Sequence, residues 1–327
     1  MSFHKLGSVV IVISMFITMS CDKIVNPTPN PVDPVESAYQ DFEDRGTIEN
    51  PELDEASGIV YSNTNPGYLW SFNDSNNPNK IFLFDSKGQG KYNFTLTNAP
   101  NRDWEAMGIF KETDGTSTLF VADIGDNFAQ YSNYVLYWFK EPTLDANQPN
   151  RSLSGISKLQ FTLSDGVKRD MEAILIDQKT KDIFIISKRE DQKKLYKISG
   201  DKLIDGNVVV AEYLKDINFS NPFSSYEQVK TYFFVTDANV SPDNTEILVR
   251  NYGEVYYWKR KTGESIPEAL DRQARVVPSH TKYALLSNGQ GEAQGEGVCF
   301  SFNADGYYTV SESDGITPSH LYYFKKK

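Results

Sequence analysis

Glu105–Asp123 reads EAMGIFKETDGTSTLFVAD and contains two apolar runs separated by the turn-forming pair Asp114-Gly115. An acidic residue opens the first run, and an acidic residue ends the second. An Asp-Gly pair between two apolar runs favours a tight hairpin turn. This stretch therefore predicts a β-hairpin with a carboxylate at the start of its first strand and another at the end of its second.

The same two-part pattern occurs five times along the chain, which indicates a repeat protein. In each repeat a small or acidic residue opens the first apolar strand, and a polar residue ends the second. The first strands open at Ser57, Glu105, Glu172, Asp237 and Glu296. The second strands end at Asn73, Asp123, Lys188, Arg250 and Glu312.

A third strand rich in aromatic residues follows each hairpin, and a fourth strand follows most of them. The third strands are expected at residues 80–84, 134–139, 195–198, 255–258 and 321–324. The fourth strands are expected at residues 92–96, 158–163, 208–211 and 283–286. Because only three lysines follow Phe324 in the last repeat, we expect the N-terminal stretch 38–48 to supply its fourth strand.

Repeats of four strands predict an all-β fold, a five-bladed β-propeller whose last blade is closed by an N-terminal strand. Closing the ring removes the exposed edges that a β-sheet must otherwise protect. Six blades is the alternative, if residues 212–234 form more than a loop and a strand. We expect residues 37–327 to form this single propeller domain.

The residues that open the first strands are expected to meet at one mouth of the central channel, because the first strand of each propeller blade lines that channel. Four of the five are carboxylates, which repel one another unless a proton or a cation lies between them. Oxygen ligands without His or Cys favour Ca²⁺ over Zn²⁺. The alternative is that these carboxylates cap backbone amides or pair with basic residues such as Lys188. The predicted metal ligands are Ser57, Glu105, Glu172, Asp237 and Glu296.

A second set of polar residues follows the second strands and is expected at the same mouth. Its members carry both signs of charge, and its basic residues suit phosphate or carboxylate groups. The alternative is that the basic residues neutralise the carboxylates. This predicted ligand-binding set is Asn73, Asp74, Asp123, Asp126, Asn127, Lys188, Arg189, Arg250 and Glu312.

The N-terminus has the pattern of an exported protein. Lys5 precedes an apolar run, and a small residue stands before Cys21, as in the signal peptides of bacterial lipoproteins. We expect cleavage after residue 20, acylation of Cys21 and anchoring in a lipid bilayer of the bacterial envelope, at the outer membrane, the cell surface or the periplasmic side. Residues 21–36 are rich in proline and predict an extended tether of about 45 Å. The alternative is ordinary secretion.

Composition excludes several other functions. The chain has 33 Lys and Arg against 44 Asp and Glu, a net charge of −11, so nucleic acid is not an expected partner. Cys299 lies in an apolar strand and is expected to be inert, and the histidines do not suit a catalytic triad or a zinc site. We expect a monomer that takes a small anionic or carbohydrate ligand.

The segments 103–107, 121–127 and 169–174 resemble bacterial secreted β-propellers described as WD40-like or phytase-esterase-like, over residues 50–326. That group implies the fold and no particular activity. The order Ser, Glu, Glu, small polar, Glu is also similar to the calcium-activated nucleotidase (apyrase) family of five-bladed propellers. This second resemblance implies an axial Ca²⁺ held by the five predicted metal ligands, and hydrolysis of nucleoside phosphates. The chain departs from it at Asp237, where the family has Ser.

Two functions remain open from the sequence. The first is a metal-dependent phosphohydrolase that uses the carboxylates of the mouth. The second is a non-catalytic module that binds a polysaccharide, a peptide or a partner protein, which exposed aromatic residues at the mouth would favour.

Overall fold

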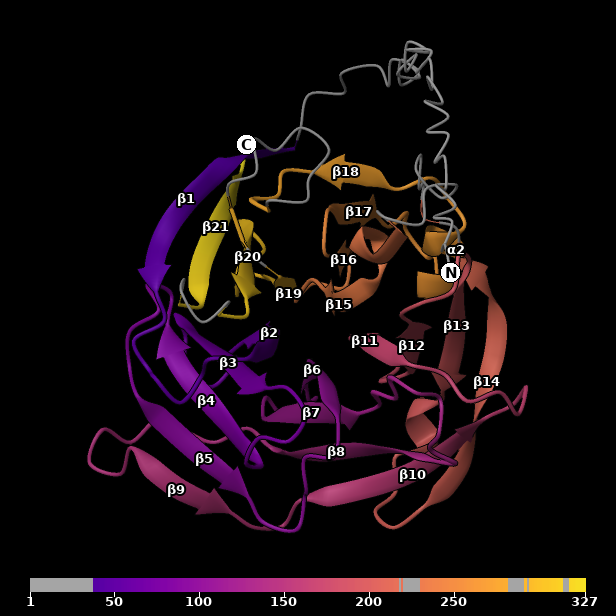
Figure 1. Cartoon of the computed structure of the whole chain (residues 1–327), viewed down its shortest axis with the longest axis horizontal. Helices are drawn as coiled ribbons and strands as arrows, with labels where there is room; N and C mark the ends of the chain where they lie inside the picture. Colours follow the sequence, from indigo (N-terminus) through magenta and orange to yellow (C-terminus); the bar gives the residue numbers. More distant parts are fainter. Residues whose placement is uncertain (1–37, 218, 220–229, 282–290, 293, 314–317) are drawn as a thin grey trace, which may run out of the picture. The chain divides into compact units, whose positions relative to one another are not determined.

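The computed structural model describes residues 38–217, 219, 230–281, 291–292, 294–313 and 318–327 (Figure 1). Glu36–Lys327 form one compact unit. The predicted signal peptide, Cys21 and the tether lie outside the described residues, and so does the strand expected at 283–286. The described residues are almost entirely β-strand, turn and loop, so the prediction of an all-β fold is confirmed.

Five innermost strands surround the centre of the view in Figure 1, and the arrangement is propeller-like. Each packs against the next, and the last packs against the first. They consist mainly of small and apolar residues and are buried almost completely on both faces. They are β2 (Ala56–Tyr61), β6 (Trp104–Lys111), β11 (Met171–Ile176), β15 (Val235–Val240) and β19 (Gly295–Phe300).

Two further strands follow each innermost strand in antiparallel order, as the repeat predicts. The second strands are β3 (Tyr68–Asn73), β7 (Ser117–Asp123), β12 (Ile183–Ser187), β16 (Glu246–Asn251) and β20 (Gly306–Ser311). The third strands are β4 (Lys80–Asp85), β8 (Tyr134–Lys140), β13 (Lys193–Ile198), β17 (Val255–Lys259) and β21 (His320–Lys326). Trp70 and Trp104 are fully buried between these sheets, so both belong to the core.

The outer strands join the sheets in ways that the repeat alone does not predict. β10 (Ser157–Leu163) pairs with β8, and the first half of β14 (Val208–Ile217) pairs with it in parallel, while the second half pairs with β13. This connection merges two repeats into an eight-stranded sheet. β9 (Asn150–Leu153) adds in parallel to β5 (Tyr92–Leu96).

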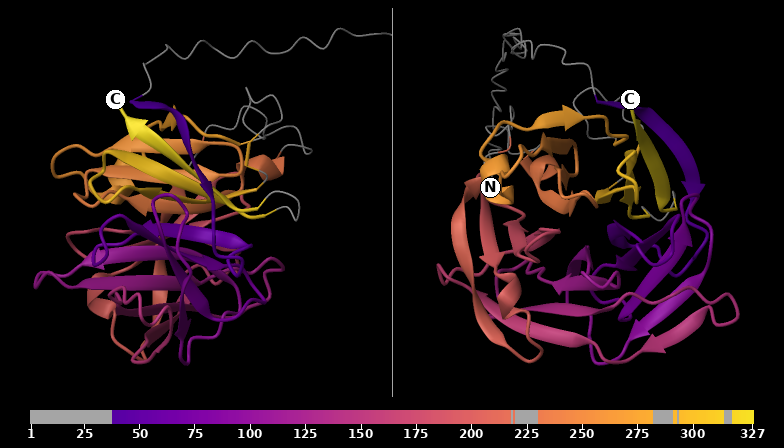
Figure 2. Two further views of the ribbon diagram at one scale, coloured as in Figure 1. Left: turned by 90° about the vertical axis from the view of Figure 1, so that its left-hand side faces the viewer. Right: turned by 180° about the vertical axis from the view of Figure 1, so that it is seen from behind.

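The last two sheets end in short or distant segments of the chain. β18 (Arg275–Val277) pairs with β17, upstream of the fourth strand expected at 283–286. β1 (Tyr39–Thr47) pairs antiparallel with β21, and Figures 1 and 2 show the two strands side by side. The prediction that an N-terminal strand completes the last repeat is therefore confirmed.

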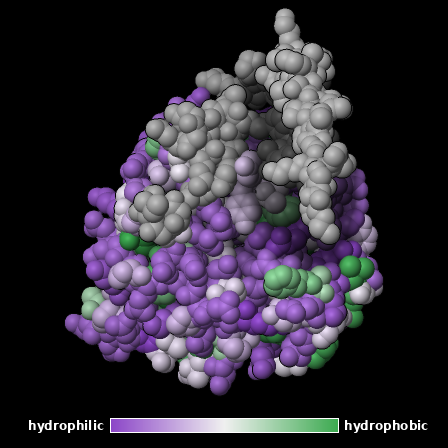
Figure 3. Space-filling model, in the orientation of Figure 1, coloured by the Kyte–Doolittle hydropathy of each residue, from purple (hydrophilic) through white to green (hydrophobic). Residues whose placement is uncertain are grey.

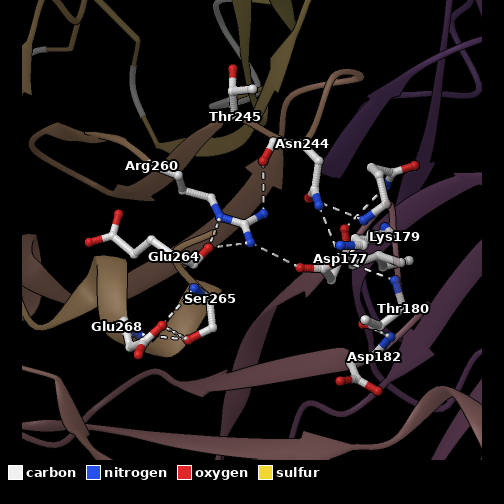
Figure 4. Close-up of polar contacts among 12 residues, drawn as sticks. Asp177, Lys179, Thr180, Asp182, Asn244, Thr245, Arg260, Glu264, Ser265 and Glu268 are labelled. Atoms are coloured by element: carbon white, nitrogen blue, oxygen red, sulfur yellow. Dashed lines mark hydrogen bonds and ion pairs between the residues drawn. The ribbon is translucent and has the colours of Figure 1, made fainter. Parts of the chain in front are cut away.

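Arg260 connects the turn after β11 to the repeat that follows it (Figure 4). Its Nη2 donates to Asp177 Oδ2 at 3.2 Å, and its Nη1 donates to the backbone oxygen of Asn244 at 2.8 Å. Asn244 Nδ2 in turn donates to Asp177 Oδ1 at 3.1 Å. Since Arg260 and Asp177 are both largely buried, this network fixes two neighbouring sheets against each other.

The helices of the described residues are short. They are α2 (Ile266–Leu270) and the 3₁₀ turns η1 (Gly200–Lys202) and η2 (Thr231–Phe233). Ser265 and Glu268 form a capping box at the start of α2. None of the described helices has the length and apolar character needed to cross a membrane. The described residues on the face shown in Figure 3 are mostly hydrophilic.

Candidate functional site

Each innermost strand carries a β-bulge near its start. In every innermost strand, one residue near the start is skipped and has no partner on the second strand, while the residues on either side of it are paired. A bulge leaves its extra residue unpaired and turns that side chain away from the ladder. The skipped residues are Ser57, Glu105, Glu172, Thr236 and Glu296.

The structure corrects the fourth member of the predicted ring from Asp237 to Thr236. Asp237 pairs with Arg250 in the ladder, whereas Thr236 is the skipped residue. Asp237 is fully buried and accepts backbone N–H groups from Ala238 and Val298, both at 2.8 Å. Its carboxylate therefore joins the neighbouring innermost strands β15 and β19. The one-residue shift could not be predicted from the sequence repeat, because a bulge leaves no sequence pattern of its own.

A pocket of about 300 Å³ lies where four of the five bulged side chains meet, while Thr236 does not line it. Four of the five predicted metal ligands line it, and so do four of the predicted ligand-binding residues. Those eight are Ser57, Glu105, Glu172, Glu296, Asp74, Asn127, Lys188 and Arg189. The sequence reasoning did not single out the other lining residues, which are Thr231, Phe234, Tyr252 and Gln294.

Lys188 reaches into the carboxylates of this pocket. Its Nζ lies 2.6 Å from Glu172 Oε1, and its side chain is 10% exposed. Burial disfavours the ammonium, but the charges of Glu172, Glu105 and Glu296 hold the pKa of Lys188 well above its usual range. The sequence left open whether the ring carboxylates bind a metal or pair with basic residues. Glu172 pairs with a basic residue, Lys188.

The remaining carboxylates of the ring have weaker partners. Ser57 Oγ donates to Glu105 Oε2 at 3.3 Å. Gln294 Nε2 donates to Glu296 Oε1 at 2.9 Å and to Glu312 Oε2 at 2.8 Å. Among the described residues, no Lys or Arg forms an ion pair with Glu105, Glu296 or Glu312.

Two aspartates that the sequence reasoning did not select complete the site. Asp103 and Asp170 each stand two residues before a ring glutamate, in Asp-Trp-Glu and Asp-Met-Glu. Carboxylate oxygens of Asp74, Asp103 and Glu105 lie within 4.8 Å of one another, and so do those of Glu105, Asp170 and Glu172. The repeated Asp-x-Glu spacing was the signal that could have found both aspartates.

The crowding of buried carboxyl groups raises their pKa values. Burial raises the pKa of Glu105 well above its usual range, and the charges of Glu172 and Asp74 raise it further. Burial and nearby carboxylates raise the pKa of Asp103 to about 6 and that of Glu312 to about 9. In the absence of a cation, protons are therefore held in this pocket at pH values where exposed carboxyl groups are ionised.

Several residues of the predicted second set have structural partners instead. Asn73 Oδ1 accepts the N–H of Glu55 at 3.2 Å, and Asp123 Oδ1 accepts that of Asp103 at 3.0 Å. Asp126 accepts two backbone N–H groups of its own loop, at 2.7 and 2.9 Å. None of these three side chains lines the pocket.

Arg250 is also absent from the lining of the pocket. It is 1% exposed, pairs with Glu292 and donates to the backbone oxygen of Gly297 at 2.8 Å. Lys188 directly follows the residue that pairs with the position before the bulge in the third repeat, and Tyr252 holds the same place in the fourth. Tyr252 does line the pocket. The sequence reasoning therefore chose a residue two positions too early in the fourth repeat.

The raised pKa of Asp103 predicts a pH dependence of stability for the metal-free protein. Protonated Asp103 stabilises the folded state fully below its unfolded pKa of about 4, and this contribution is lost as the pH rises through about 6. We expect Asp103→Asn to gain up to about 3 kcal/mol of stability over the parent protein between pH 4 and pH 7. Urea unfolding in chelator at both pH values measures the difference, and parallel pH profiles would contradict the prediction.

Comparison with known proteins gives little similarity. No protein-family model matches the chain, and no curated protein matches it. Among solved structures, hydrazine synthase of Kuenenia stuttgartiensis is similar over 81% of this chain and 57% of its own, with 12% sequence identity and a TM-score of 0.37. The chain thus spans less than two thirds of that structure, and a similarity at this level carries no statement about activity.

Proposed function

We propose that the protein is a lipid-anchored envelope protein whose central pocket binds a divalent cation, Ca²⁺ in the first place, and a phosphate-bearing or other anionic ligand beside it. On this proposal it acts as a metal-dependent phosphohydrolase. The N-terminal signal pattern and Cys21 support the anchor. Mass spectrometry of the purified N-terminus tests it, and an unmodified Cys21 would overturn this part.

The proposal includes a propeller of five blades. Each innermost strand begins one antiparallel unit, and β1 completes the last unit through its pairing with β21. The eight-stranded sheet then consists of two blades joined by the parallel pairing of β10 with β14. The regular bulge at the start of each innermost strand supports this division.

The excess of buried carboxylates is the observation that carries the cation site. Six carboxylates, all buried except the half-buried Asp74, lie in the pocket or in the clusters beside it, while Lys188 and Arg189 are the only basic residues of the described chain that line it. Buried carboxylates that cannot all be neutralised by basic side chains favour a bound cation. Oxygen is the only ligand atom they offer, which suits a hard ion such as Ca²⁺. The six are Asp74, Asp103, Glu105, Asp170, Glu172 and Glu296.

Arg189 is the residue that an anionic ligand would meet first. Its side chain is 38% exposed, and its Nε lies 2.6 Å from Asp170 Oδ2, which orients the guanidinium toward the pocket. Asn127 accepts a hydrogen bond from the same guanidinium. A bound divalent ion would supply Lewis acidity and an activated water for hydrolysis. Thr236 adds no ligand to the pocket, since it does not line it and its Oγ1 donates to the backbone oxygen of Gly295 at 3.0 Å.

A second candidate function is a non-catalytic binding module. Phe128 follows the pocket residue Asn127 and is 83% exposed. A large aromatic ring left in solvent beside a pocket is typical of surfaces that bind sugars or peptides. On this alternative the cation orders the pocket without taking part in a reaction.

Calorimetric titration of the purified, metal-stripped chain with Ca²⁺ tests the cation site. We expect saturable binding that Glu105→Gln with Glu172→Gln abolishes. The matched control is Glu43→Gln with Asp201→Asn, which removes the same charge from two exposed positions and should bind like the parent. Absence of binding by the parent protein would overturn the proposal.

Phosphate release from nucleotides and from p-nitrophenyl phosphate separates the two functions. Release that requires Ca²⁺ and is lost in the double variant supports the hydrolase. Calcium-dependent retention of a phosphorylated ligand or a polysaccharide, without phosphate release, supports the binding module and overturns the catalytic part.

A further inference from the structure

The positive charge of the pocket is distributed unequally between its two carboxylate clusters. In the cluster of Glu105, Asp170 and Glu172, Lys188 pairs with Glu172 and Arg189 pairs with Asp170, each at 2.6 Å. In the cluster of Asp74, Asp103 and Glu105, no described Lys, Arg or His forms an ion pair with any member. The second cluster is therefore the one that still lacks a counterion.

Asp103, a member of this second cluster, has one carboxylate oxygen without a partner in the described part of the chain. The residue is 6% exposed, and its Oδ1 is buried without a hydrogen-bond partner among the described residues. A buried oxygen of an ionised carboxylate is costly to leave unpaired. Its backbone N–H, in contrast, is bound by Asp123 Oδ1 at 3.0 Å, and its side chain also bonds to Glu105, so the position of the residue is fixed while Oδ1 keeps its lone pairs unused by the described residues.

Gly125 leaves open the space that the two carboxylates share. A Cβ at this position would lie 2.6 Å from Asp103 Oδ2 and closer still to Glu105 Oε1. Gly125 is held there because its N–H donates to the backbone oxygen of Asp103 at 3.1 Å. Any residue other than glycine would therefore displace the carboxylates of Asp103 and Glu105.

We propose that the divalent cation binds off the axis of the ring, between Asp74, Asp103 and Glu105 and against Gly125, while Lys188 occupies the axial position as a built-in cation. This inference rests on the proposed cation site and specifies its ligands. Glu105 belongs to both clusters. Its carboxylate would therefore lie between the bound ion and the Lys188–Glu172 ion pair. Six or more oxygen ligands are usual for Ca²⁺, so water and the anionic ligand complete its coordination.

The test compares two variants that remove equal charge from opposite sides of the pocket. Asp103→Asn takes a ligand from the off-axis site, and Glu296→Gln takes a carboxylate from the ring alone. Calorimetric titration of the full chain with Ca²⁺ is expected to show at least about a 10-fold loss of affinity for Asp103→Asn and less than about a 3-fold loss for Glu296→Gln. Circular dichroism checks that both variants are folded.

Gly125→Ala is the third variant, since it fills the space without changing charge and is expected to weaken binding like Asp103→Asn. Should it fail to fold, Asp74→Asn takes its place with the same expectation. Retained affinity in Asp103→Asn with loss in Glu296→Gln would overturn the off-axis site and leave the proposed function standing. No binding by the parent chain would overturn both.

Discussion

Lys188→Met is expected to destabilise the metal-free protein by about 3–5 kcal/mol at pH 7, because it leaves Glu172 buried without its cation. The loss should shrink as the pH falls, since a protonated Glu172 needs no counterion and burial already raises its pKa. Urea unfolding at pH 5 and pH 7 in chelator measures both effects. Lys188→Arg keeps the charge and is the control, with a much smaller expected loss.

The same variant also distinguishes the two positions for the cation. If Lys188 is the axial cation and the metal lies beside Asp103, removing Lys188 opens a second place, and the Ca²⁺ stoichiometry should rise from one to two. Calorimetric titration gives the stoichiometry directly. A single site of higher affinity in Lys188→Met would instead mean that the ammonium and the metal compete for one position, which contradicts the off-axis site.

The positions of the strands could be predicted because a propeller-like fold repeats the same burial pattern. Strands such as β6 and β7 are buried on both faces and read as continuous apolar runs between turn residues. β1 could be predicted as well, since the last repeat lacked a fourth strand and the stretch 38–48 could supply one. β9 and the parallel pairing of β14 with β10 could not, because outer-strand pairing depends on which loops pack together and leaves little periodicity.

The repeat also predicted part of the site, because it places a polar residue at the start of each innermost strand. Glu105, Glu172 and Glu296 were found because each opens an apolar run, and the structure brings all three to one pocket. Thr236 was missed because the aspartate after it is the more conspicuous residue, although that aspartate bonds to backbone amides. Asp103 was missed because it precedes its strand, where a carboxylate is usually a solvated turn residue.

A charged residue at the end of a strand did not predict reliably which side chains line the pocket. Arg250 and Lys188 both end an apolar run, yet Lys188 reaches the pocket and Arg250 is enclosed by β16, β19 and β20. The difference arises from the strand register, in which Arg250 pairs opposite the residue after the bulge and so faces the interior. Residue type therefore indicated a polar network at the mouth, and the register decided which side chains line the pocket.

Arg250→Met is expected to lower the free energy of unfolding by about 3–5 kcal/mol. It removes the counterion of Glu292, which is 3% exposed and whose Oε1 has no hydrogen-bond partner among the described residues even in the intact pair. Gly295 shows how closely the guanidinium is enclosed, since a Cβ there would lie 2.5 Å from Arg250 Cζ. Denaturant unfolding measures the loss.

Arg250→Met combined with Glu292→Met is expected to recover most of that stability, because two apolar side chains of similar volume replace the buried pair without leaving a charge. The double variant also decides whether Arg250 has a role in ligand binding. Its affinity for Ca²⁺ and for the anionic ligand should equal that of the parent, since neither side chain lines the pocket. A folded double variant that binds the cation normally but has lost the anionic ligand would show that Arg250 reaches the ligand after all, and that the pocket rearranges when it is occupied.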